Sequence, residues 1–268
     1  MRLTAAVTGA SGYLGSHLAD FLEQGGWDVR RMSRSGAHAW TLGGEADLSG
    51  TSALIHCAHD FRDPKANVEG AARLLDEARR AAVTSVIFVS SLAAFEGCKS
   101  IYGQTKLEIE HMVVKEGGIV ARPGTIFGGK AGGIMGTMQR VVSRLPIVPM
   151  IGMGSTRLYM VHVTDLSRCL ERLARTPDEF RGSVVSIAAL KPITFRALLA
   201  AMAAAEHRRR IFVPIPGALI RAGLVIAETL GLRLPLRSDS VVSLLAGNPR
   251  VELDGRFENL EPFSVRLS

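Results

Sequence analysis

AAVTGASGYLG, residues 5–15, is the stretch that decides the fold of this chain. Its short apolar run ends in glycines spaced three apart and leads into an amphipathic segment, which predicts a strand, a tight turn and a helix start. We expect Gly9 to make the turn, Gly12 to let a pyrophosphate approach the backbone, and Gly15 to let the helix pack against the strand. Turns use glycine for many reasons, but this position between a strand and a helix favours nucleotide binding over an ordinary turn.

Strands and helices alternate over the next hundred residues. Apolar runs predict strands, and helical spacing of apolar residues predicts helices that end at 25–26 and span 64–82 and 101–115; the strands are expected at 27–32, 53–58, 86–91 and 119–123. Residues 38–50 are short and irregular, and we expect an abbreviated strand there with no full helix after it. The alternation predicts an α/β protein with a doubly wound, Rossmann-type parallel sheet.

The pattern loosens towards the C-terminus. We assign residues 1–165 to a dinucleotide-binding core and residues 166–268 mainly to a small substrate-binding lobe. A late strand at 184–187 either stays in this lobe or returns to the core sheet. Residues 217–232 are the longest apolar stretch, but Arg221 and Glu228 interrupt it, and it falls short of the ~20 residues that a spanning helix needs. We read it as a buried or interface helix without stable membrane insertion.

Composition excludes several classes of protein. The net charge of +7 favours anionic ligands, but the basic tract 207–210 has no interleaved aromatic residues and is read as a solvated helix end, with no nucleic acid as partner. Cys57, Cys98 and Cys169 are odd in number and lack metal-ligand spacing, so neither a disulfide framework nor a metal site is expected. With no signal segment at the N-terminus, these features predict a cytoplasmic protein.

The residues after the second expected strand indicate which dinucleotide is bound. Ser33 and Arg34 lie where such a fold reads the adenosine ribose. An acidic residue there would bind the 2′-hydroxyl of NAD, whereas a small hydroxyl residue followed by arginine suits the 2′-phosphate of NADP. The sequence therefore favours NADP, with NAD as the alternative.

Tyr102 and Lys106 lie four residues apart in an expected helix, so their side chains share one face. A tyrosine that acts as a base near pH 7 needs a pKa about 3 below its ordinary value of about 10, which corresponds to about 4 kcal/mol. One positive charge about 4 Å away in a partly wet site supplies about that much. Ser91 ends a strand eleven residues earlier and could bind the same substrate oxygen. The alternative is that Ser91 caps a strand end and Tyr102 packs at the surface.

At this point the chain resembles the extended short-chain dehydrogenases/reductases, and most closely their NAD-dependent epimerase/dehydratase group. The resemblance covers about residues 3 to 175 and rests on motifs that occur in the order of that group: TGASGYLG at 8–15, IHCA at 55–58, NVEG at 67–70, FVSS at 88–91, YGQTK at 102–106, RPGTIFG at 122–128 and GSTRLYMVHVTD at 154–165.

The resemblance implies a role for each matching residue. Tyr102 would be the acid/base, Lys106 would lower its pKa and hold the nicotinamide ribose, and Ser91 would bind the substrate oxygen. It implies a cofactor site formed by Gly9, Ser11, Gly12, Tyr13, Leu14, Gly15, Ala58 and Pro123, together with Ser33 and Arg34. Arg157 would hold a substrate diphosphate or, alternatively, make an ordinary surface salt bridge. The resemblance also implies a homodimer formed through helices 66–82 and 101–115.

Two departures from the group put a nucleotide-sugar substrate in doubt. The interval from Ser91 to Tyr102 is short, and the helix after the third strand is missing, so walls around the substrate are lost. A smaller or more apolar carbonyl compound then becomes credible. Aromatic and methionine residues could line its pocket, or could simply fill the core: Phe95, Met135, Met138, Met150, Met153 and Met160.

We therefore predict an NADP(H)-dependent oxidoreductase or epimerase/dehydratase-like enzyme. It would transfer hydride to or from a carbonyl or secondary alcohol of a small molecule, sugar nucleotides included, with Tyr102 as acid/base. One alternative is a non-catalytic dinucleotide-binding sensor or scaffold, although such a protein has no need of Ser91, Tyr102 and Lys106 together. Another is a membrane-associated or electron-transfer-complex subunit, which the apolar 217–232 stretch and the basic charge would suit.

Overall fold

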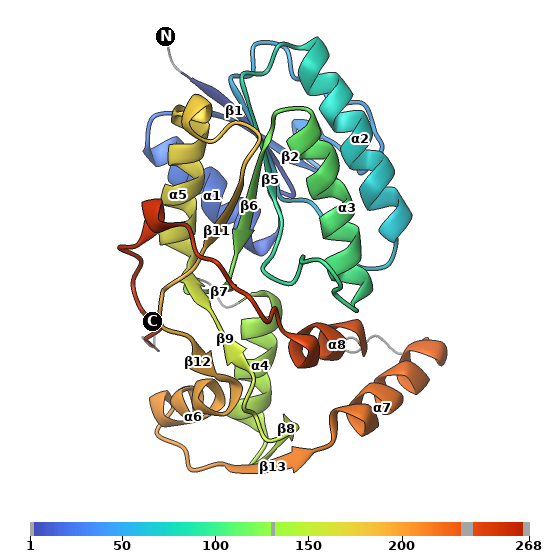
Figure 1. The fold of residues 1–268 in the computed structure, drawn as a ribbon, viewed down its shortest axis with the longest axis vertical. Coiled ribbons are helices and arrows are strands. Elements are labelled where there is room, and N and C mark those ends of the chain that lie inside the picture. Colours follow the sequence, from blue (N-terminus) through green and yellow to red (C-terminus); the bar gives the residue numbers. More distant parts are fainter. Residues whose placement is uncertain (1–2, 130–131, 232–237, 265–268) are drawn as a thin grey trace.

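A seven-stranded parallel sheet forms the centre of the computed structural model, which describes residues 3–129, 132–231 and 238–264 (Figure 1). Its order is β11-β6-β5-β4-β1-β2-β3, and each of its pairings is parallel. The strands are β1 (Thr4–Thr8), β2 (Asp28–Ser33), β3 (His38–Ala39), β4 (Ala53–His56), β5 (Ser85–Val89), β6 (Ile119–Pro123) and β11 (Val184–Ile187). The predicted doubly wound α/β fold is confirmed, and the abbreviated strand expected within 38–50 is the two-residue β3.

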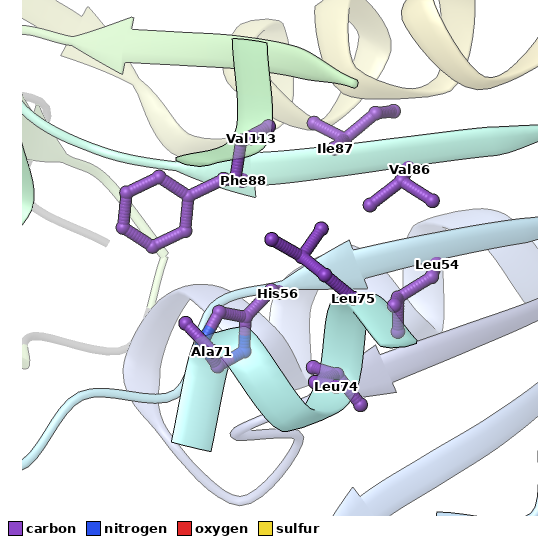
Figure 2. A pocket seen from close by; sticks show the side chains of 9 residues that line it. All are labelled: Leu54, His56, Ala71, Leu74, Leu75, Val86, Ile87, Phe88 and Val113. Atoms are coloured by element: carbon purple, nitrogen blue, oxygen red, sulfur yellow. The ribbon is translucent and has the colours of Figure 1, made fainter. Parts of the chain in front are cut away.

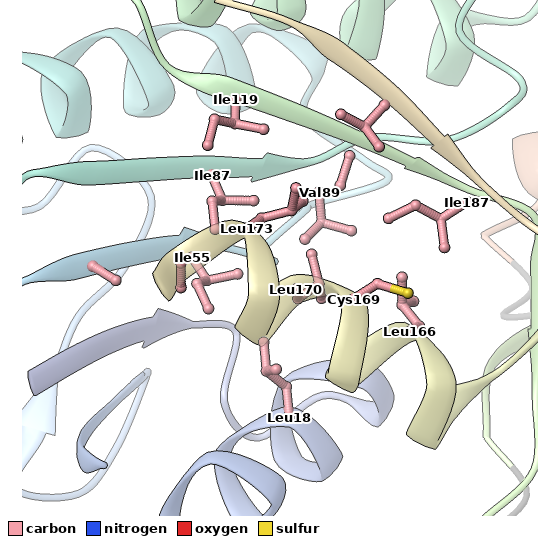
Figure 3. Packing of buried hydrophobic residues seen from close by; sticks show 14 of the residues in the cluster. Leu18, Ile55, Ile87, Val89, Ile119, Leu166, Cys169, Leu170, Leu173 and Ile187 are labelled. Carbon is pink, nitrogen blue, oxygen red and sulfur yellow. The ribbon is translucent and has the colours of Figure 1, made fainter. Parts of the chain in front are cut away.

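Helices cover both faces of this sheet (Figure 1). One face carries α1 (Tyr13–Gln24) and α5 (Val163–Arg175), and the other carries α2 (Pro64–Arg80) and α3 (Ile101–Lys115). Figure 3 shows Leu18 of α1 and Leu170 of α5 packed with Ile55, Ile87 and other strand residues in one buried cluster. Parallel strands buried on both faces read as continuous apolar runs, which is why the sequence marked them clearly.

The face under α2 is tightly filled. Nine side chains, among them His56, Leu74 and Phe88, surround a cavity of only about 10 Å³ (Figure 2). A space of that size holds at most one water, and its lining is almost wholly aliphatic and aromatic. It is therefore a packing gap in the core and not a ligand site.

A second, smaller body packs below the carboxyl edge of the sheet (Figure 1). Its buried cluster includes Met135, Met150 and Met160, so these methionines fill a core. The elements outside the main sheet and its helices are β7 (Thr125–Phe127), α4 (Gly133–Arg144), β8 (Ile147–Ile151), β9 (Arg157–Leu158), β10 (Met160–His162), η1 (Pro177–Glu179), β12 (Ile193–Thr194), α6 (Phe195–Ala205), β13 (Ile211–Ile215), α7 (Gly217–Thr229), α8 (Ser238–Ala246) and η2 (Gly255–Phe257).

The expected domain boundary at residue 165 does not separate the two bodies, because elements on each side of it pack into the other body. Helix α5 packs on the main sheet, and β11 pairs with β6 at its edge, so the strand expected at 184–187 returns to the core sheet. Conversely, α4 and β8 precede residue 165 but belong to the second body.

Helix α7 contains the long apolar stretch, yet only Leu224 and Ala227 of it are buried. Leu219, Ile226 and Leu230 are 64%, 60% and 71% exposed. Of the two expected alternatives, a buried or an interface helix, burial does not describe most of α7, because its main packing partner is the short helix α8. Among the described residues, no helix combines the length and the apolar character needed to cross a bilayer.

Candidate active site

The glycine turn between β1 and α1 has the close contacts that require glycine. Gly9 has a φ of +67°, and a Cβ there would lie 2.9 Å from the Ala58 Cα. A Cβ on Gly15 would lie 2.2 Å from the Gly9 carbonyl oxygen, so α1 starts in direct contact with the turn. Gly12 caps α1 without a side-chain hydrogen bond. The turn thus brings the start of α1 beside the ends of β1 and β4, where an anion would be favoured.

Thr8 fixes the neighbouring strand end. Its Oγ1 accepts the backbone N–H groups of Cys57 and Ala58, both at 3.1 Å, and lies 2.7 Å from His56 Nδ1. Because the oxygen is already an acceptor, its hydroxyl proton is free to be donated to Nδ1, which leaves the imidazole proton on Nε2. Burial lowers the pKa of His56 to about 3, consistent with a neutral ring. These bonds hold Ala58 against Gly9.

A hollow of about 440 Å³ opens beside the turn and the end of β2. Ser11 and Ser33 line it, whereas Arg34, the next residue along the chain, is exposed and is not part of the lining. Arg31 also lines it, but Asp20 and Glu23 already pair with that guanidinium, at 2.5 and 2.7 Å. None of the described lining residues is acidic. The hollow lies where the sequence predicts the adenosine ribose.

Tyr13 connects the turn to the glycine-rich loop that follows β7. Its hydroxyl donates to the Gly128 carbonyl at 2.6 Å, and burial raises the pKa of this phenol to about 12. A Cβ on Gly132 would lie 2.7 Å from the Tyr13 ring, so the loop closes directly over it. Tyr13 is therefore a structural strut as well as a residue of the predicted phosphate site.

Tyr102 and Ser91 meet at the end of β5. Tyr102 is the second residue of α3, and Ser91 follows β5, where its hydroxyl accepts the Ala93 N–H at 3.2 Å. Burial raises the pKa of the Tyr102 phenol to about 12, and the opposing effect of the Ser91 side chain is smaller. The sequence predicts that Lys106 lowers this pKa; in the structure burial has the larger effect and acts in the opposite direction.

Lys106 lies one turn further along α3 and is only 3% exposed. Its Nζ donates to the Val89 carbonyl at 2.8 Å and sits 4.5 Å from the Phe88 ring centroid, but 5.9 Å from that of Tyr102. Burial lowers the pKa of this ammonium to about 8. The ammonium is hydrogen-bonded to the strand, and it does not offset the effect of burial on the pKa of Tyr102.

Two ring residues after β4 cover Tyr102. His59 packs edge-on against the Tyr102 ring with centroids 5.0 Å apart, and Phe61 stacks on it at 5.5 Å. Among the described residues, His59 Nδ1 is buried without a hydrogen-bond partner, and burial lowers the pKa of this imidazole to about 2. Phe61 remains 58% exposed, so it lies at the mouth of the site. The sequence analysis did not single out His59 or Phe61. The sequence feature that could have indicated them is a pair of ring-bearing residues just after the expected strand at 53–58.

The C-terminal part of the chain also reaches this site. Asp239 of α8 accepts the backbone N–H groups of Ile101 and Tyr102, at 2.8 and 2.9 Å. Ser100 caps the same helix by accepting from Gly103 at 3.1 Å. No local sequence pattern marks Asp239, because its partners lie more than a hundred residues earlier.

Of the remaining predicted residues, Pro123 lies near the end of β5 and Arg157 lies in β9 of the second body. Pro123 lies beside the catalytic strand end, since its carbonyl accepts the Leu92 N–H at 3.1 Å. Arg157 lies in β9, pairs in register with Thr194 of β12, and is exposed. No cluster of metal-ligating side chains occurs among the residues that the structure describes.

Comparison with known proteins agrees with this geometry. A family model described as the NAD dependent epimerase/dehydratase family matches residues 5–188. A ceramide reductase from Caulobacter vibrioides is 32% identical over 200 residues, which are 66% of this chain and 62% of that protein. The chain thus spans less than two thirds of this relative.

Two solved structures share the fold. One is MoeE5 in complex with UDP-glucose and NAD, with a TM-score of 0.69 and 20% identity over 81% of this chain and 85% of that one. The other is RMD from Pseudomonas aeruginosa complexed with NADPH, with a TM-score of 0.66 and 18% identity over 91% of this chain and 97% of that one. The chain belongs to the NAD-dependent epimerase/dehydratase family.

Proposed function

We propose that this protein is an NADP(H)-dependent reductase that converts a carbonyl group of an apolar substrate to a secondary alcohol, with Tyr102 as the proton donor. The observation that carries this proposal is the placement of Tyr102, whose ring packs against His59 and Phe61 and which lies one helical turn before the buried Lys106. A reductase among the relatives supports the same reaction class.

The residues present fit a dinucleotide. A Cβ on Gly9 or Gly15 would collide with backbone, so the turn keeps the backbone open to a phosphate, and the hollow beside Ser11 and Ser33 can take the adenosine end. When bound, the reduced nicotinamide supplies the hydride for the carbonyl carbon. Ser11, Tyr13 and Leu14 would hold the pyrophosphate, and Ala58, Lys106 and Pro123 would hold the nicotinamide end.

Tyr102 and Ser91 do the protein's share of the chemistry. The Ser91 hydroxyl would donate to the carbonyl oxygen and polarise it, and the Tyr102 hydroxyl would give its proton to that oxygen as the C–O bond becomes single. A pKa of about 12 keeps Tyr102 protonated at neutral pH, which suits reduction better than oxidation. The Lys106 ammonium, held by the Val89 carbonyl, would supply positive charge near the phenolate that forms.

The preference for NADP rests on the end of β2. Ser33 lines the hollow, Arg34 is exposed beside it, and no acidic side chain is present among the described lining residues to bind a free 2′-hydroxyl. Arg34 forms no ion pair with any residue that the structure describes, so a 2′-phosphate could recruit it by a side-chain rotation.

The substrate proposal rests on the mouth of the site. His59 and Phe61 place apolar ring surface over Tyr102, and the chain lacks the long insertion before Tyr102 that would build a sugar pocket. Binding of a nucleotide sugar through Arg157 is the second candidate, because that side chain is exposed and could take a diphosphate. The homodimer through α2 and α3 and a cytoplasmic location remain predictions.

The decisive experiment measures NADPH oxidation with a panel of long-chain ketones, short ketones and nucleotide sugars. Tyr102→Phe should abolish turnover and leave the NADPH Kd within about threefold, since the phenol oxygen acts in chemistry and not in holding the phosphates. Activity retained by Tyr102→Phe would refute the assignment. If the protein binds NADPH but oxidises it with no compound of the panel, the sensor reading is favoured instead.

A further inference from the structure

We propose that the exposed face of α7 docks on the surface of an anionic lipid bilayer, without entering it as a spanning segment. Leu219 and Ile226 lie at the seven-residue spacing that places side chains on one face of a helix, and Leu230 follows directly at the end of α7. Each is more than half exposed. The opposite face, with Leu224 and Ala227, packs into the protein.

The exposed surface of α7 is mostly apolar, with Arg221 and Thr229 as its exposed polar residues. Ala218, Ala222, Gly223 and Val225 complete the surface and are exposed as well. The one acidic residue of α7, Glu228, is on the packed side, where it accepts from the backbone N–H and hydroxyl of Ser238 at 2.9 and 2.7 Å. A helix with this division of its faces has the pattern of an interfacial helix, with one apolar face and no buried charge to desolvate.

The apolar surface continues beyond α7. Strand β13 leads directly into the helix and exposes Ile211 and Val213, 65% and 40% respectively. Its partner β8 exposes Ile147, which pairs in register with Ile211. In Figure 1, β8, β13 and α7 together occupy the lower end of the molecule, away from the central sheet. Contiguous exposed apolar surface of this kind marks an interaction site.

The charges around this apolar surface favour an anionic lipid bilayer over a second copy of the chain as the binding partner. Residues 207–231 contain four arginines and a single acidic residue, Glu228, which is already bonded to Ser238. Arg208, Arg209 and Arg221 are exposed. In a two-fold dimer the same patch faces itself, so arginines would oppose arginines. An anionic lipid surface instead attracts them, by about 1 kcal/mol for each arginine near the surface.

The docking surface is connected to the catalytic helix by hydrogen bonds. Glu228 of α7 holds Ser238 at the start of α8, and the next residue, Asp239, holds the backbone N–H of Tyr102. A bilayer bound to α7 would therefore be linked to the start of α3, which carries Tyr102, by the contacts of Glu228 with Ser238 and of Asp239 with Tyr102. Docking itself does not depend on the proposed function, because it is measured as binding.

The test is co-flotation of the full chain with vesicles of equimolar phosphatidylcholine and phosphatidylglycerol. Leu219→Gln with Ile226→Gln should lower the partition coefficient at least tenfold, because each side chain loses its transfer into the interface. The matched control is Leu190→Gln, which alters a side chain 58% exposed, close to the 60% of Ile226, in the segment between β11 and β12. It should bind like the wild type.

The electrostatic part is tested separately. Arg221→Gln should weaken binding to the anionic vesicles and leave the weak binding to pure phosphatidylcholine unchanged, and salt should lower the former only. Failure of the wild type to float, or equal flotation of the double glutamine variant, would overturn the proposal. So would a concentration-dependent dimer in sedimentation that the double variant loses while vesicle binding stays absent, since a second copy would then cover α7.

Discussion

The Asp239 carboxylate of α8 accepts the backbone N–H of Tyr102 at 2.9 Å, at the start of α3 and across 137 residues of sequence. The second oxygen accepts from Ile101, so both unpaired donors at the helix start have an acceptor. A carboxylate is also favoured there by the helix dipole. The C-terminal part of the chain thus helps to hold the start of α3, which carries Tyr102.

Replacing Asp239 with alanine should damage both stability and catalysis. Loss of the two acceptors should lower the free energy of unfolding by about 1–2 kcal/mol, and a looser Tyr102 should reduce kcat more than it raises KM. Urea unfolding and steady-state kinetics measure the two effects. Asp178→Ala is the control, because that side chain is 89% exposed and pairs only with Arg181. A variant Asp239→Ala with wild-type kcat would refute the positioning role.

Phe61 should control the pKa of Tyr102. Burial raises this pKa to about 12, and part of the cover is the stacked Phe61 ring. Phe61→Ala admits water and stabilises the phenolate, so Tyr102 should ionise at a lower pH than in the wild type. Ultraviolet titration of tyrosinate, with Tyr102→Phe as the baseline for Tyr13 and Tyr159, isolates the change. An unaltered or higher pKa would show that Phe61 contributes no desolvation.

The fold should lose stability in mild acid through His56. Its folded pKa is about 3, against about 6.5 in the unfolded chain. Between these values the unfolded state binds a proton that the folded state does not, so stability falls as pH drops below 6.5. At pH 5 the cost is about 2 kcal/mol from this group alone.

The variant His56→Asn separates this effect from that of other acid-titrating groups. Asparagine can still accept from the Thr8 hydroxyl but does not titrate, so its urea stability should vary less between pH 7 and pH 5 than that of the wild type. Parallel pH profiles for the two proteins would contradict the assignment.

Arg34 should set the choice between NADPH and NADH. Arg34→Asp removes the cation expected to meet the 2′-phosphate and adds an acceptor for a free 2′-hydroxyl, so the ratio of the NADPH and NADH affinities should fall at least tenfold. Fluorescence titration with each nucleotide gives the ratio. Arg250→Asp, at an exposed arginine outside the predicted cofactor site, makes the same charge change and should leave it unaltered. An unchanged ratio in Arg34→Asp would remove the basis for proposing NADP.

Sequence reasoning succeeded where the signal was local. The parallel strands are buried on both faces and therefore appear as continuous apolar runs, and the helices between them show clear periodicity. The glycine turn could be read residue by residue because φ at Gly9 and the contact of Gly15 with the Gly9 carbonyl follow from short-range sterics. Even the shortened β3 was visible as a segment too short for a full strand and helix.

The expectations that failed depended on distant neighbours. Spacing placed Lys106 one turn from Tyr102, but the ammonium bonds the Val89 carbonyl and burial dominates the pKa of the phenol. The composition of α7 indicated burial, yet its packing leaves most of the apolar face uncovered. Burial and desolvation are properties of the packed chain, and periodicity alone does not reveal them.

The sequence by itself determined the parallel sheet and the glycine turn, because both follow from backbone sterics and local apolar patterns, whereas the roles of Ser91, Tyr102 and Lys106 remain predictions. Only the tertiary structure decided what surrounds Tyr102. It brought His59 and Phe61 over the ring, placed Asp239 at the helix start, and buried the phenol so that it keeps its proton. Those effects arise from desolvation and from contacts between segments far apart in the chain, which folding alone brings together.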